Sequence, residues 1–148
     1  MACSNVQYII DDRDAIALND AYPRINEILS ENKSIILLTG IWSCIPVELS
    51  NKNELIYKGK IQTDHSTGLG TSEIGLLTVH KNEKVLLQIN NKQQIILEVD
   101  KLKDFDFIYI DRQIKKRTYN QYKNDSDFRT ERYVDYEITF SNRLQTFR

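Results

Sequence analysis

Three short apolar runs joined by polar turns constrain the fold of this chain more than any other feature. The runs cover Ile74–His80, Lys84–Ile89 and Gln94–Val99, and only three or four polar residues separate consecutive runs. Apolar residues alternate along the second and third runs, which is the period of a half-buried β-strand. Parallel neighbours need a crossover of a dozen or more residues, so these short joints predict antiparallel hairpins.

Further segments extend the pattern along the chain. Strand-like runs occur at Ser34–Cys44, Glu54–Gln62, Phe105–Ile114 and Arg132–Phe140. In the last run, the residues expected to face inward are Val134, Tyr136, Ile138 and Phe140. Apolar side chains recur at helical spacing over Asn19–Asn32, with Asn19 or Asp20 as the cap and Pro23 in the first turn. We therefore predict a mainly β (α+β) fold, in which an antiparallel meander of about seven strands forms a small barrel or strongly curved sheet beside one N-terminal helix.

The composition favours one domain covering residues 1–148, with an N-terminal strand and helix segment (1–33) before the meander (34–148). The chain is 41% hydrophobic and 28% charged, which is ordinary globular usage. Five glycines and two prolines leave no room for a flexible linker. No apolar run approaches the roughly 20 residues that a membrane-spanning helix needs, so no transmembrane segment is expected.

The two cysteines, Cys3 and Cys44, form neither a disulfide framework nor a zinc spacing. Two reduced thiols predict a cytoplasmic protein. The alternative is a surface-anchored bacterial lipoprotein, because Met1-Ala2-Cys3-Ser4 is also what remains when a lipoprotein signal is trimmed and a start Met added. Cys44 follows Trp42 closely and is expected to be buried in a strand as a small hydrophobe.

Catalytic and metal-binding patterns are weak in this sequence. His65 and His80 are the two histidines, and His65-Ser66-Thr67 matches one half of the paired His-x-Ser/Thr motif of two-histidine phosphoesterases. The second half would be His80-Lys81-Asn82, which lacks the hydroxyl residue. We therefore expect no catalytic residue, no metal site and no cofactor, while an enzyme with a dispersed site at either histidine remains an alternative.

The charge is unevenly distributed, and its basic part defines a candidate site. Residues 112–148 contain nine Lys or Arg and five Asp or Glu, whereas residues 1–111 contain eleven and sixteen. The candidate ligand-binding residues are Arg112, Lys115, Lys116, Arg117, Tyr119 and Tyr122, and Arg129, Arg132 and Arg143 join them if the last strands pair. Cations recognise phosphate or carboxylate, and tyrosines stack on bases. The structural alternative is a solvated hairpin tip whose charges discourage edge-to-edge pairing.

Two tripeptides resemble elements of the lipocalin family. Gly40-Ile41-Trp42 resembles the Gly-x-Trp motif of its first strand, and Val134-Asp135-Tyr136 is similar to its Thr-Asp-Tyr element, with Val in place of Thr. The resemblance implies a barrel with a ligand cavity, structural roles for Gly40 and Trp42, and a tryptophan packed over the base of the barrel. It also implies an arginine that packs on the tryptophan, for which Arg143 is the counterpart.

These observations predict a non-enzymatic binding module that holds a small-molecule ligand or a protein partner on its barrel or curved sheet. The alternative is a protein that binds or sequesters phosphorylated small molecules or nucleic acid through the basic segment 112–123, as a phage inhibitor or an immunity protein does. A nucleotide-like anion is the ligand that fits this alternative. Exposed strand edges also allow a homodimer.

Overall fold

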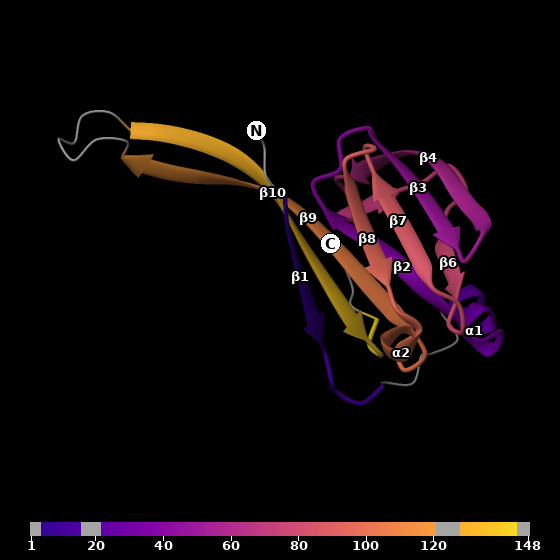
Figure 1. Cartoon of the computed structure of the whole chain (residues 1–148). Helices are drawn as coiled ribbons and strands as arrows, with labels where there is room; N and C mark the ends of the chain where they lie inside the picture. Colours follow the sequence, from indigo (N-terminus) through magenta and orange to yellow (C-terminus); the bar gives the residue numbers. More distant parts are fainter. Residues whose placement is uncertain (1–3, 16–21, 121–127, 145–148) are drawn as a thin grey trace.

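The computed structural model describes residues 4–15, 22–120 and 128–144, with residues 4, 117–120 and 128–131 described by their backbone only. Within these residues the chain forms ten strands and two short helices (Figure 1). The elements are β1 (Ser4–Ile10), α1 (Pro23–Ser30), β2 (Lys33–Gly40), β3 (Ile45–Asn51), β4 (Glu54–Asp64), β5 (Leu69–Thr71), β6 (Leu77–His80), β7 (Val85–Ile89), β8 (Gln93–Leu97), α2 (Val99–Leu102), β9 (Phe107–Asn120) and β10 (Phe128–Ser141). The mainly β prediction is confirmed, but with more strands than expected and a second helix.

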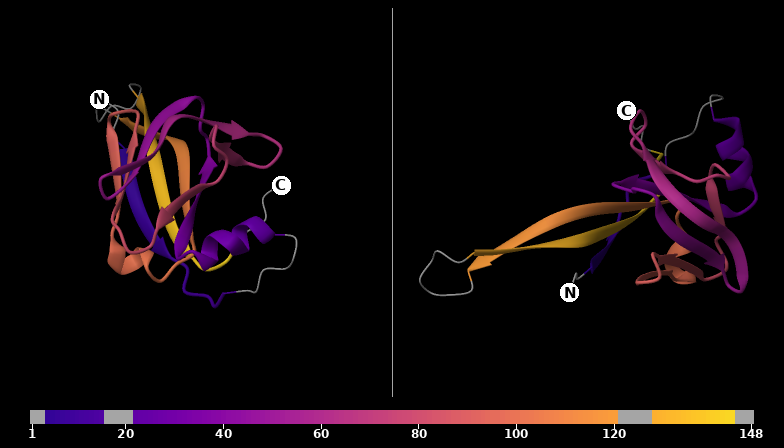
Figure 2. Two further views of the ribbon diagram at one scale, coloured as in Figure 1. Left: turned by 90° about the vertical axis from the view of Figure 1, so that its right-hand side faces the viewer. Right: turned by 90° about the horizontal axis from the view of Figure 1, so that it is seen from above.

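One mixed sheet curls into a nearly closed barrel (Figure 2). The strand order is β1-β10-β9-β2-β5-β4-β3-β7-β8, and β6 also pairs with β2. Two neighbouring pairs are parallel, β1 with β10 and β2 with β9, so the prediction of an antiparallel meander is wrong for these pairs. The reason is that α2 carries the chain from β8 to the far side of β2, while β1 pairs with the last strand rather than with its neighbour in sequence.

The predicted three-run meander is only half correct. β7 and β8 form the expected antiparallel hairpin. β6, however, pairs with β2, and β7 pairs with β3. Asn51 of β3, a fully buried residue, fixes this corner, because its side chain accepts the backbone N–H of His80 and donates to the carbonyls of His80 and Glu83.

Among the described residues, twenty buried ones form a single apolar cluster that fills the barrel interior. As the alternation predicted, Tyr136, Ile138 and Phe140 are buried there and Val134 is partly buried. The opposite face of β2 and β9 carries a second, smaller cluster under α1. Both faces of β9 are therefore covered where it lies against the barrel.

Three local predictions need correction. The helix is shorter than Asn19–Asn32: it begins at Pro23, and the proposed caps at 19 and 20 lie outside the described residues. β3 was not predicted, since a proline such as Pro46 indicates the end of a strand or the edge of a sheet, and here it lies within a strand. Cys44 is exposed rather than buried, because β2 already ends at Gly40 and Cys44 lies in the following turn with a φ of 49°.

β9 and β10 continue beyond the barrel as a long two-stranded ribbon (Figures 1 and 2). Their pairing runs without a break from Ser141↔Phe107 to Phe128↔Asn120. The polar and aromatic composition of residues 118–127 indicates a long hairpin loop, but Thr118, Tyr119 and Asn120 belong to β9, so the beginning of this stretch is strand.

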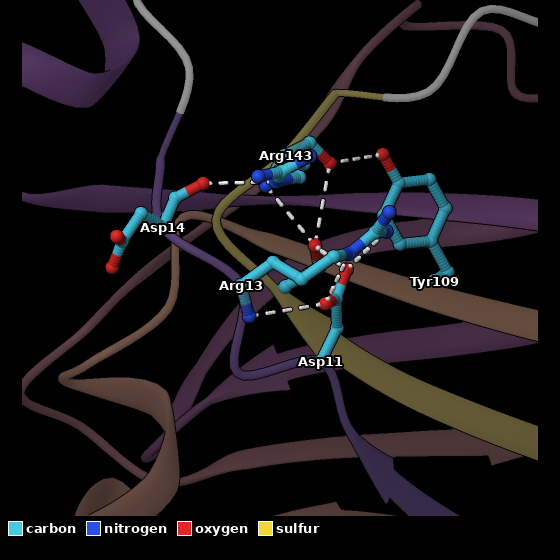
Figure 3. A network of polar contacts seen from close by, with 6 residues as sticks. Asp11, Arg13, Asp14, Tyr109 and Arg143 are labelled. Carbon is cyan, nitrogen blue, oxygen red and sulfur yellow. Dashed lines mark hydrogen bonds and ion pairs between the residues drawn. The ribbon is translucent and has the colours of Figure 1, made fainter.

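A polar network fixes the end of β1 on the outside of the sheet (Figure 3). The Asp11 carboxylate accepts hydrogen bonds from Arg13 Nε (2.8 Å), Arg13 Nη2 (2.7 Å) and Ser141 Oγ (2.8 Å). These donors, led by Arg13, hold the pKa of Asp11 far below its usual value. Next to it, Arg143 Nε donates to the Asp14 carbonyl, and the Tyr109 hydroxyl donates to the Arg143 carbonyl.

We expect Asp11→Asn to lower the melting temperature by a few degrees at neutral pH. The folded pKa of Asp11 lies below the unfolded one, so its stabilising contribution is complete above about pH 5 and is lost as pH falls from about 4. Melting curves recorded from neutral pH to below about pH 4 should therefore show that the difference in melting temperature between wild type and Asp11→Asn becomes smaller as the pH falls. Asp12→Asn, at an exposed neighbour, serves as control. A difference that does not change with pH would contradict this assignment.

Candidate functional site

The ribbon presents two chemically different faces near its base. Because successive side chains of a strand point to opposite faces, the inward residues of β9 and β10 continue outward as one series. We call this series the inner ribbon face; it comprises Arg112, Ile114, Lys116, Arg132, Val134 and Tyr136. The outer ribbon face comprises Asp111, Gln113, Lys115, Tyr133, Asp135 and Glu137.

Arg112 has a structural position at the end of the barrel. Its guanidinium carbon lies 5.9 Å from the centroid of the Trp42 ring, its Nη1 donates to the Ile41 carbonyl (2.9 Å) and its Nε donates to the Tyr136 hydroxyl (3.3 Å). Trp42 is fully buried, and its Nε1 donates to the Thr39 carbonyl (2.7 Å). The Arg112 side chain therefore covers Trp42 as a cation–π lid.

The arginine that packs on Trp42 is not the expected Arg143. The register places Arg112 beside Gly40 on one side and opposite Tyr136 on the other, so its side chain reaches the indole. Arg143 instead belongs to the network around Asp11 and Asp14. The two tripeptides that resemble lipocalin elements do meet, since the rings of Trp42 and Tyr136 lie 6.4 Å apart.

Lys115 is neutralised by a carboxylate of the neighbouring strand β10, which lies diagonally across the ribbon from it. Its Nζ lies 2.7 Å from Asp135 Oδ2, and the Asp135 side chain is 9% exposed. The hydrogen bond to this carboxylate and its charge raise the pKa of Lys115. The outer ribbon face also carries Asp111 and Glu137 at opposed positions. An approaching anion therefore meets paired or negative groups on this side.

Lys116 and Arg132 form the unneutralised part of the inner ribbon face. The two residues are directly opposed across the ribbon, and both are exposed. Cβ atoms of such pairs lie about 5 Å apart, and like charges placed this way repel. Among the described residues, no carboxylate forms an ion pair with either cation. Ile114, which is 46% exposed, lies between this cation pair and the Arg112 lid.

The six candidate residues thus divide into three groups. Arg112 and Lys115 are engaged in contacts within the protein, whereas Lys116 is available to a partner. Arg117 and Tyr119 lie in the stretch of β9 described by its backbone only, and Tyr122 lies outside the described residues, as does Cys3. Arg132 completes the pair with Lys116; it depended on the pairing of the last strands, which the register now supplies.

The two histidines do not share a site. His80 pairs with Lys33 at the beginning of β2, whereas His65 lies in the turn between β4 and β5, and β5 pairs with Thr39 near the end of β2. Six residues of strand separate these positions by about 20 Å. Within the described ranges, no group of three or more His, Cys, Asp or Glu residues is placed to hold a metal ion.

No protein-family model matches this chain, and no curated protein matches its sequence. In the part of the chain that the structure describes, no helix is long and apolar enough to span a membrane. The geometry and charge of the ribbon are therefore the observations from which a function can be argued.

Proposed function

We propose that this chain is a non-enzymatic binding protein that holds an anionic partner on the inner ribbon face. The observation that carries this proposal is the directly opposed, exposed and uncompensated pair Lys116 and Arg132. Keeping two cations side by side has an electrostatic cost, which a bound anion removes. Phosphate is the group that fits best, because a lysine and an arginine together supply both a point charge and a planar set of donors.

A phosphate-rich polymer, in the first place a nucleic acid, is the partner that fits the shape of this site. Residues 112–120 of β9 and 128–132 of β10 contain six Lys or Arg and one Glu, and the ribbon formed by these two strands extends away from the barrel (Figure 1). A two-stranded β-ribbon also fits the major groove of duplex DNA. Contacts confined to the ribbon predict binding that depends strongly on salt.

A ligand enclosed within the barrel is less well supported. Twenty buried side chains pack there as a single cluster, which includes the Trp42 indole at the end capped by Arg112. If the ligand is a small molecule, we therefore expect it to bind at the barrel wall rather than in the barrel interior.

Charge reversal tests the proposed site directly. We expect Lys116→Glu with Arg132→Glu to weaken binding of fluorescein-labelled single- or double-stranded oligonucleotides by roughly tenfold or more, measured by fluorescence anisotropy at several salt concentrations. The dependence of log affinity on log salt should also become shallower, by about 1 for each lost phosphate contact.

Lys60→Glu with Lys92→Glu is the matched control, since it changes the net charge equally at two exposed lysines on β4 and on the turn after β7. This control should lose much less affinity. Equal losses in both double variants, or wild-type protein that binds no oligonucleotide even at low salt, would contradict the proposal. Circular dichroism of each variant verifies that the fold is retained.

A further inference from the structure

The edge of β2 that faces away from β9 is shared by two short strands. β6 pairs with Lys33–Ile36, and β5 pairs with Leu38 and Thr39. The chain between β5 and β6, residues 72–76, forms a tight turn with an isolated bridge between Ser72 and Gly75. A hollow of about 320 Å³ opens at this interruption of the barrel wall, and its apolar lining is Ile36, Leu37, Leu38, Leu69, Leu76 and Leu77.

The turn at residues 72–76 gives the hollow a defined shape. Ser72 Oγ donates to the Gly75 carbonyl (2.8 Å), and the Gly75 N–H donates to the Ser72 carbonyl (3.2 Å). Gly75 has a φ of 85°, a conformation that favours glycine. The turn places Leu76 against the hollow, whereas Ile74 is 57% exposed and does not line it.

The chemistry of the lining selects uncharged ligands. Among the residues that the structure describes, no charged side chain borders the hollow. Its two hydroxyl groups, on Thr71 and Ser72, already donate to the carbonyls of Gln62 and Gly75. The exposed Glu73 lies on the same turn and repels a carboxylate. Protein interiors are close-packed, and apolar hollows of this size are typical of small-molecule sites.

We propose that this hollow is a binding site for a small neutral apolar molecule, such as an aliphatic chain with an uncharged head group. The site is separate from the ribbon and does not depend on the function proposed for it. Its occupant would remove from water the apolar surface that the fold leaves exposed in this hollow.

Trp42 supplies a built-in reporter for this site. It is the one tryptophan in the chain. A Cβ atom added to Gly70, which borders the hollow, would lie 3.2 Å from Trp42 Cδ1. Gly70 is therefore a thin wall between the hollow and the buried indole. A ligand in the hollow should change the emission of Trp42.

Octanol and octanoate, which share one chain length and differ in charge, are suitable probes. For the wild-type chain we expect octanol to raise the melting temperature and to shift Trp42 emission in a saturable manner, and octanoate to act at least several-fold more weakly. Leu76→Asn should abolish the octanol response, because it removes an apolar wall at a half-exposed position. Ile74→Asn, in the same turn but outside the hollow, should retain the response.

Three results would overturn the proposal: no saturable response of the wild type to octanol, equal responses to octanol and octanoate, or loss of the response in Ile74→Asn. Should Leu76→Asn fail to fold, Leu76→Ala provides the weaker form of the same change. The ribbon variant Lys116→Glu with Arg132→Glu should keep its octanol response, so failure of one proposal is distinguishable from failure of the other.

Discussion

Gly40→Ala is expected to destabilise the protein by about 3 to 5 kcal/mol, one of the largest effects available to a single methyl group in this chain. Gly40 has a φ of 85°, which any L side chain adopts with strain. The added Cβ would also lie 2.2 Å from the Arg112 carbonyl oxygen and 2.9 Å from its amide nitrogen. These are backbone atoms of β9, so the clash with the added Cβ can be relieved only if β2 and β9 move apart.

Urea denaturation measures this loss, with Gly68→Ala as the control. Gly68 has a similar φ of 78°, but no atom lies within 4 Å of a Cβ added there. Gly68→Ala therefore carries the conformational strain alone, which is about 1 kcal/mol. If the two variants unfold at the same urea concentration, the close contact between Gly40 and Arg112 does not exist in solution.

Trp42→Ala is expected to lower the free energy of unfolding by about 3 to 5 kcal/mol. The fully buried indole packs against Tyr136, lies under the Arg112 guanidinium and donates its N–H to Thr39. Truncation therefore leaves a large cavity and removes the ring beneath a cation. Trp42→Phe should cost less, because it keeps a ring in place while leaving the Thr39 carbonyl without this donor.

Urea denaturation followed by far-ultraviolet circular dichroism is the appropriate measurement, since both variants lack the fluorophore. Ile41→Ala is the neighbouring control: Ile41 is 46% exposed, so its truncation should cost about 1 kcal/mol or less. A Trp42→Ala variant as stable as Ile41→Ala would show that the indole does not close this end of the barrel.

The relation between sequence and fold is clearest in the strands whose periodicity is regular. The alternation over 132–140 correctly indicated Tyr136, Ile138 and Phe140 as inward residues, and that over 84–99 indicated the β7–β8 hairpin. Both succeed because the direction of a side chain along a strand is a local property of the backbone. β3 could not be predicted in the same way, because it contains Pro46 and prolines are usually found at strand ends or sheet edges.

The candidate site likewise combines a property that the sequence reveals with details that only the structure reveals. A basic segment near the C-terminus is visible in the sequence, but its cations differ in ways that composition does not reveal. Lys115 forms an ion pair with Asp135, and Arg112 packs on Trp42, so each has a partner within the fold. Lys116 faces Arg132 and has none among the described residues. These differences follow from one register, which aligns residue 116 with residue 132.

By itself, the sequence determined where most strands lie, which of their residues are apolar, and that the C-terminal part of the chain is basic. Only the tertiary structure decided which strands become neighbours: β1 beside β10, and β2 beside β9. The physical reason is that strand periodicity is local, whereas pairing and register depend on packing between segments far apart in sequence. That packing placed Arg112 on Trp42, opened the hollow beside β2 and left Lys116 and Arg132 facing each other.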